Sequence, residues 1–83
     1  MAYNIIYKSS VKRDLKGIGK PEARRILDQV EADLSSTPEK YPALKGEFEG
    51  LRKYRVGDYR VIFAILHDEV LVLRIGHRKD VYR

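Results

Sequence analysis

The chain contains no cysteine, which excludes disulfides, thiolate metal sites and cysteine nucleophiles together. This absence fits a reducing cytosol, and we expect a cytoplasmic protein. No basic segment followed by a long apolar stretch opens the chain, so no signal peptide is expected. No apolar run approaches the length that spans a bilayer, and we expect no membrane partner.

Common enzyme and cofactor motifs are also missing. There is no G-x-x-x-x-G-K-[ST] phosphate-binding loop, no G-x-G-x-x-G dinucleotide motif and no H-E-x-x-H metal motif. The two histidines, His67 and His77, have no partner at ligand spacing. We therefore expect neither a metal site nor a cofactor.

Charge is distributed unevenly along the 83 residues, which are enough for one small domain over 1–83. The net charge is +5. Residues 1–50 hold nine Lys/Arg against eight Asp/Glu, whereas residues 51–83 hold eight against four, a net of +4. A basic patch of this kind indicates a polyanionic partner, most often nucleic acid. An anionic membrane surface and a merely solvated basic face are the alternatives.

The first half of the chain predicts one strand and two helices. Residues 3–8 are rich in β-formers, and Ser9-Ser10 is a candidate N-cap for a short helix that ends near Gly17. Pro21 fits the first turn of the second helix. This helix has an apolar stripe made of Ala23, Ile26, Leu27, Val30 and Leu34. Its other charged residues are expected on a solvated face, namely Arg24, Arg25, Asp28, Glu31 and Asp33.

The second half predicts a loop over residues 39–50 and then a meander of three antiparallel strands, over 51–56, 59–66 and 70–75. The last two strands are apolar on both faces, so we expect them to be central or covered on both sides. The fold class is therefore α+β, in the order β-α-α-β-β-β, with an antiparallel sheet and two helices packed on one face.

The stretch Gly57-Asp58 suits a two-residue hairpin, since glycine accepts the positive φ of a type II′ turn at its first central position. That register places Arg55 directly across from Arg60. Because side chains alternate between the faces of a strand, Lys53 shares a face with these two arginines. Like charges at paired positions reduce stability, so we interpret the cluster as a binding surface. An exposed hairpin kept soluble by charge is the alternative.

Three more polar residues, His77, Arg78 and Tyr82, follow the last strand and are predicted near the same end of the sheet. Together with the three cations of the hairpin they form a cluster suited to a phosphodiester. Arginine neutralises a phosphate and the charge that grows on it in the transition state, and lysine, histidine or tyrosine can transfer protons. Without a metal, the nucleophile can be the substrate's own 2′-hydroxyl, which only RNA carries.

Two runs of the chain resemble the RelE branch of the RelE/ParE toxin superfamily: LRKYRVGDYRVIF at 51–63 and VLVLRIGHRKDVY at 70–82. The resemblance implies the toxin of a type II toxin–antitoxin pair. It implies a metal-independent endoribonuclease that enters the ribosomal A site and cuts mRNA through attack of the 2′-hydroxyl on the neighbouring phosphate. The implied partners are the ribosome, mRNA and a cognate antitoxin.

By position in the family's pattern, the resemblance implies four catalytic residues. They are Lys53 as a candidate base, Arg60 at the scissile phosphate, Arg78 near the leaving 5′-oxygen and Tyr82 at the nucleophilic nucleotide. We also predict that three further residues bind the RNA, namely Arg55, His77 and Lys79. Arg52 is basic as well, but its place in the strand directs it to the other face of the sheet.

Two other functions stay open, a ParE-like inhibitor of DNA gyrase and a non-catalytic RNA-binding module. A gyrase inhibitor has no reason to keep phosphate-cleaving groups together, whereas a binding module needs only the basic face. For a toxin, we expect an acidic amphipathic segment of the antitoxin to cover the basic face and balance its charge.

Overall fold

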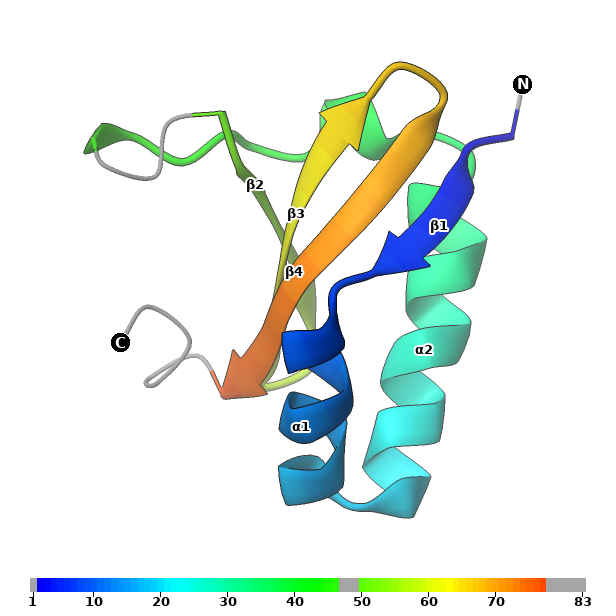
Figure 1. Ribbon diagram of the computed structural model, residues 1–83, viewed down its shortest axis with the longest axis vertical. Coiled ribbons are helices and arrows are strands. Elements are labelled where there is room, and N and C mark those ends of the chain that lie inside the picture. Colours follow the sequence, from blue (N-terminus) through cyan, green and yellow to red (C-terminus); the bar gives the residue numbers. More distant parts are fainter. Residues whose placement is uncertain (1, 47–49, 78–83) are drawn as a thin grey trace.

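The computed structural model describes residues 2–46 and 50–77. Within these ranges the chain forms four strands, two α-helices and a short 3₁₀ helix. In chain order they are β1 (Asn4–Tyr7), α1 (Ser9–Ile18), α2 (Lys20–Leu34), η1 (Pro38–Lys40), β2 (Arg52–Val56), β3 (Tyr59–Leu66) and β4 (Glu69–His77) (Figure 1). The predicted order of helices and strands is therefore confirmed.

The four strands form one sheet in the order β1-β4-β3-β2. β2, β3 and β4 are an antiparallel meander, as predicted. β1 instead pairs in parallel with β4, so the sheet is mixed and not antiparallel throughout. Parallel strands cannot be joined by a tight turn, and here both helices, β2 and β3 lie between β1 and β4 in the chain.

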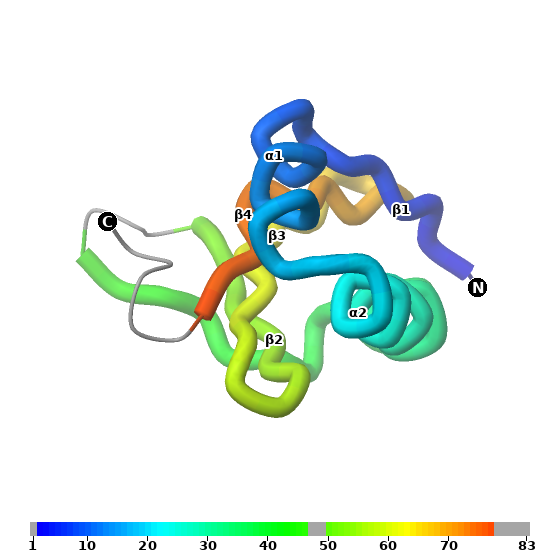
Figure 2. The backbone as a smooth tube through the Cα atoms, turned by 90° about the horizontal axis from the view of Figure 1, so that it is seen from below, coloured from blue at the N-terminus to red at the C-terminus, as the bar shows by residue number. Residues whose placement is uncertain are grey.

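One face of the sheet carries the hydrophobic core, which lies against the helices. Both helices supply fully buried side chains, Val11 from α1 and Ile26 and Val30 from α2. They pack against the inward side chains of the strands, including Val61 and Phe63, which are also fully buried. Figure 2, an end-on view, shows α2 on one side of the sheet and the loop before β2 on the other. We call the face turned away from α2 the open face.

The predicted N-cap of α1 is wrong, because Ser9 and Ser10 lie inside the helix. Lys8 occupies the capping position and makes no side-chain capping bond. The Ser10 hydroxyl instead donates to the carbonyl oxygen of Leu73 in β4, at 2.9 Å. α1 lies along β4 at this point, so the serine satisfies an edge carbonyl of the sheet instead of its own helix.

Tyrosine hydroxyls tie the sheet to the acidic side of the helical layer. Among the described residues, Tyr3 donates to Glu39 at 2.6 Å, Tyr7 to Glu31 at 2.7 Å, and Tyr54 to Asp33. The sequence pattern predicted only a solvated role for Glu31 and Asp33, but each accepts a hydrogen bond from a tyrosine. The prediction of a solvated face holds for the ion pairs of α2 with exposed side chains, Arg24–Asp28 at 3.9 Å and Arg25–Glu22 at 2.8 Å.

Replacing Gly57 should destabilise the protein. Gly57 has φ of +59°, and a Cβ added there would lie 3.1 Å from the Arg25 guanidinium. We expect Gly57→Ala to lower the free energy of unfolding by about 1–2 kcal/mol, measured by urea denaturation. The matched control is Gly17→Ala inside α1, where no described atom lies within 4 Å of the added Cβ. It should raise the free energy of unfolding by about 0.5–1 kcal/mol, and equal effects of the two variants would contradict the turn geometry.

Replacing Tyr54 should test the bond between β2 and α2. Tyr54 is 6% exposed, and Tyr54→Phe leaves the Asp33 carboxylate without its donor, so we expect a loss of about 1 kcal/mol in the free energy of unfolding. Tyr41→Phe is the matched control, because the Tyr41 ring packs edge-on against Tyr54 but its hydroxyl makes no hydrogen bond to the described residues. An equal loss in both variants would contradict a specific contribution of the bond from the Tyr54 hydroxyl to Asp33.

The same pair predicts a dependence of stability on pH. Burial, and then the hydrogen bond to Asp33, raises the pKa of Tyr54 above its usual value. The unfolded chain therefore ionises this tyrosine first, near pH 10, while the folded protein keeps the proton. Its contribution to stability is complete below pH 10 and is lost as the pH rises further. Wild type should lose stability above pH 10 more steeply than Tyr54→Phe, as urea denaturation at several pH values would show.

Candidate nucleic-acid interface

Basic side chains gather on the open face at the end of the sheet nearest the β2–β3 turn. The register pairs Arg55 with Arg60 and Lys53 with Ile62, as the hairpin analysis predicted. On the other side of β3, Ile62 pairs with Arg74 of β4. Four cations thus share the open face, and we call Lys53, Arg55, Arg60 and Arg74 the basic cluster.

A pocket of about 320 Å³ lies beside the basic cluster. Its lining includes three of the four cations and no carboxylate among the described residues: Tyr41, Pro42, Lys53, Tyr54, Arg55 and Arg60. A cavity with this lining is suited to an anion, since a phosphate can meet several positive groups there.

The wall of this pocket is a segment that runs along the outer edge of β2. The Lys53 amide donates to the Pro42 carbonyl at 3.1 Å. The Arg52 side chain, directed away from the open face as predicted, donates to the carbonyl oxygens of Glu39 at 3.1 Å and of Tyr41 at 2.7 Å. Arg52 is therefore a structural residue that holds the wall against the strand.

Arg74 was not predicted from the sequence, because strict alternation along β4 places it with Val70 and Val72 on the core face. The pairing of β3 with β4 shifts between Ile62 and Phe63: Phe63 pairs with Val72, whereas Ile62 pairs with Arg74. Leu73 is the extra residue of a β-bulge, and every later residue of β4 changes face. Only the register between two strands carries this signal.

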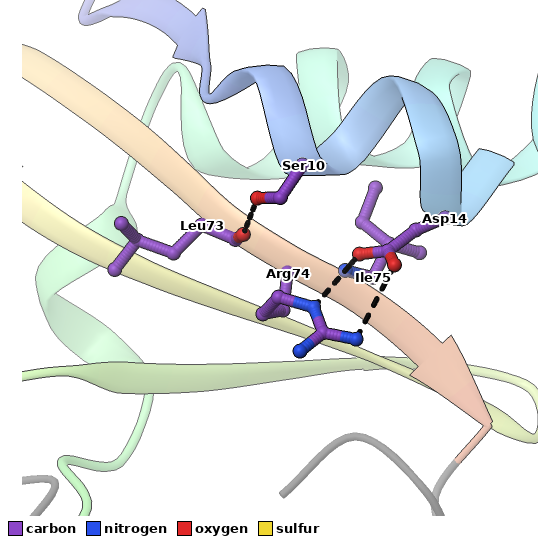
Figure 3. A network of polar contacts seen from close by, with 5 residues as sticks. All are labelled: Ser10, Asp14, Leu73, Arg74 and Ile75. Carbon is purple, nitrogen blue, oxygen red and sulfur yellow. Dashed lines mark hydrogen bonds and ion pairs between the residues drawn. The ribbon is translucent and has the colours of Figure 1, made fainter. Parts of the chain in front are cut away.

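An acidic residue of α1 holds Arg74 in place, as Figure 3 shows. The Asp14 carboxylate accepts from Arg74 Nε at 3.0 Å and from its Nη2 at 3.3 Å. The same carboxylate accepts from the Ile75 amide at 3.0 Å. Asp14 thereby joins α1 to both the backbone and a side chain of β4.

The remaining predicted site residues are placed as follows. His77 pairs with Tyr59, and the two rings meet edge-on with centroids 5.9 Å apart. His77 is thus at the same end of the sheet as Arg60 but on the opposite face, because Arg60 pairs with Gly76. Three predicted residues, Arg78, Lys79 and Tyr82, lie outside the described residues.

The other end of the open face is apolar. The register places Ile6 of β1, Leu71 of β4 and Ala64 of β3 in one row. Leu66 lies two residues further along β3. Ile6 is 41% exposed and Leu66 is 47% exposed. The open face therefore has a basic end and an apolar end.

Neither a metal cluster nor a membrane-spanning helix is found in the described part of the chain. No three His, Asp or Glu side chains within residues 2–46 and 50–77 come together to hold a metal ion. In the same ranges neither helix has the length and apolar composition needed to cross a membrane.

Comparison with known proteins places the chain in a family of toxins of type II toxin–antitoxin systems. The family described as the ParE toxin of the type II toxin–antitoxin system parDE matches residues 5–82. Toxin RelG of Mycobacterium tuberculosis is 30% identical over 86 residues, which cover 100% of this chain and 99% of the relative. Toxin RelE of the same organism is 31% identical over 84 residues, covering 98% of this chain and 87% of the relative.

The fold comparison agrees with the sequence comparison. A chain from the crystal structure of the toxin–antitoxin complex RelBE2 of Mycobacterium tuberculosis superimposes with a TM-score of 0.87 at 28% identity. The match covers 96% of this chain and 95% of that one.

Proposed function

We propose that this chain, which belongs to the RelE/ParE family of toxins of type II toxin–antitoxin systems, is a ribosome-dependent mRNA endonuclease. The observation that carries the proposal is the pocket that Lys53, Arg55 and Arg60 line on the open face. The family resemblance assigns Arg60 to the scissile phosphate, Lys53 to the base and Arg55 to a supporting position. The toxin would act in the cytoplasm, on mRNA held in the ribosomal A site.

The chemistry requires no metal when the RNA supplies its own nucleophile. The 2′-oxygen bonds to phosphorus while the bond from phosphorus to the 5′-oxygen breaks, which leaves a 2′,3′-cyclic phosphate and a 5′-hydroxyl. Negative charge grows on the non-bridging oxygens in the transition state, and fixed cations stabilise it. Arg60 has this role in the proposal, and Arg55 supports it.

Proton transfer completes the proposed reaction. Lys53 lies in the same pocket and, in its neutral form, is the candidate that takes the 2′-proton, while the leaving 5′-oxygen takes a proton from solvent. Arg78 is assigned to the leaving 5′-oxygen and Tyr82 to stacking on the nucleotide that carries the nucleophile. These two assignments rest on the family resemblance.

The proposed partner is a cognate antitoxin that covers the open face. An acidic segment would neutralise the basic cluster, and an apolar stripe on the same segment would cover Ile6 and Leu66. The similar chain from Mycobacterium tuberculosis comes from a toxin–antitoxin complex, which supports a partner of this kind.

The alternative is a ParE-like inhibitor of DNA gyrase. The match of the chain to the ParE toxin family favours this reading. The two functions differ in what the basic cluster must do, since a gyrase inhibitor makes no use of groups that stabilise a cleaving phosphate.

Primer extension on a defined mRNA, incubated with purified protein with and without programmed ribosomes, tests the proposal. We expect cuts in the A-site codon only when ribosomes are present. Lys53→Ala, which removes the candidate base, and Arg60→Ala, which removes a group that stabilises transition-state charge, should each lower the cleavage rate by about 10²–10³-fold. The double variant Arg78→Ala/Tyr82→Ala should abolish cleavage.

The matched control is Arg24→Ala, which removes an exposed cation from α2 on the other side of the sheet and should leave the rate unchanged. Cleavage of free RNA at the same rate would remove the ribosome from the proposal. Absence of cleavage by folded wild-type protein, together with inhibition of gyrase supercoiling, would establish the alternative instead.

A further inference from the structure

We propose that Arg74 is a further RNA-binding residue, one that holds a phosphate next to the scissile one. This inference rests on the proposed function and extends the binding surface beyond the pocket. No motif in the sequence pointed to it, because its position follows from the bulge in β4 and from the contact with α1.

The bulge at Leu73 determines which face of the sheet Arg74 occupies. Without the extra residue Leu73, Arg74 would face the helices together with Val72, where a guanidinium would displace core packing. The bulge places it on the open face instead, opposite Ile62 and in the same row as Lys53. Bulges occur frequently beside functional sites, where they redirect a side chain.

Asp14 fixes the orientation of the Arg74 guanidinium. Arginine has five N–H donors in one plane. Asp14 takes one from Nε and one from Nη2, which leaves the two of Nη1 and the second of Nη2 without an acceptor among the described residues. This remaining edge has the geometry that binds two phosphate oxygens in parallel. The Arg74 side chain is 42% exposed, so the edge is accessible to a ligand.

The hydrogen bonding of the β4 edge does not by itself require an arginine at position 74. Asp14 already accepts from the Ile75 amide, and Ser10 already donates to Leu73, so the edge of β4 is bonded without the guanidinium. Solvent screens the arginine of this ion pair, which is 42% exposed, and weakens its contribution to stability, although Asp14 is only 13% exposed. A cation held rigidly by a second residue is, however, what a phosphate contact benefits from, because its side chain loses little freedom on binding.

Arg74 lies across β3 from Lys53, which lines the pocket. Neighbouring strands are about 4.8 Å apart, so Lys53 and Arg74 are separated by two strand spacings, roughly 10 Å between backbones. A single RNA strand that crosses the sheet from β2 to β4 would place one phosphate in the pocket and a neighbouring one at Arg74. The proposed ligand is therefore the sugar–phosphate backbone and not a base.

The test measures single-turnover cleavage of mRNA on programmed ribosomes over a range of toxin concentrations. It yields the half-saturating concentration and the maximal rate. We expect Arg74→Gln to raise the half-saturating concentration at least tenfold, through the loss of a charge-assisted phosphate contact, while the maximal rate stays close to that of wild type. The slope of the logarithm of this concentration against log salt should fall by about 0.7, the value for one phosphate contact to a single strand.

Two variants separate binding from folding and from charge. Asp14→Asn/Arg74→Gln removes the ion pair without leaving an unpaired carboxylate, and the asparagine oxygen can still accept from the Ile75 amide. It should melt near wild type and show the same binding defect as Arg74→Gln. Arg24→Gln is the matched control, because Arg24 also pairs with an aspartate, at 3.9 Å, but lies on α2. It should change neither the half-saturating concentration nor the salt slope.

The outcomes distinguish the two proposals. If wild type cleaves on ribosomes and both Arg74 variants keep its half-saturating concentration and salt slope, the role of Arg74 is wrong while the proposed function stands. A loss that appears in Arg74→Gln but is absent in the double variant would assign the effect to the unpaired Asp14 and would also overturn it. If folded wild-type protein does not cleave, both proposals are wrong.

Discussion

The pairing of β3 with β4 decides which side chains of the C-terminal half enter the core and which reach a ligand. Val61 and Phe63 of β3 are fully buried against the helices, and this burial fixes the orientation of the strand. Side chains alternate along a strand, so the residues next to Val61 and Phe63 must face the other way. Arg60 and Ile62 therefore lie on the open face, and the partners of these residues in β2 and β4 follow them.

This arrangement brings positive charge together on the open face of the hairpin. Arg55 and Arg60 are paired across the hairpin, with Lys53 beside them, and the repulsion between such cations opposes folding. The core on the other face must offset that repulsion. A local departure of this kind from favourable pairing is typical of functional sites. Binding of an anion on the open face would relieve this repulsion.

The contact between α1 and β4 gives the basic cluster its rigid edge. β1 is short and its pairing with β4 ends at Val72, so the backbone of β4 beyond that point needs other partners. Ser10 and Asp14 of α1 supply them, at Leu73 and Ile75. Because Asp14 also binds the Arg74 side chain, the same helix that completes the sheet edge orients a cation on the open face. One carboxylate thus binds both the backbone of β4 and a side chain on the open face.

Local pattern was sufficient for part of this protein. The turn at Gly57 sets the register of the hairpin, and alternation then places Lys53, Arg55 and Arg60 together, as predicted. The apolar stripe of α2 likewise identified its buried residues correctly. These features depend on residues close in sequence, where the periods of strand and helix apply without interruption. The sequence by itself therefore determined the elements, their order and three of the four cations on the open face.

Only the tertiary structure decided the rest. The parallel direction of β1, the face of His77 and the position of Arg74 depend on how strands far apart in the chain align, and a bulge shifts that alignment by one residue. Asp14 and Arg74 are separated by 60 residues, and Tyr54 and Asp33 by 21. Periodicity cannot encode such contacts, because a one-residue change in register moves every later side chain to the opposite face.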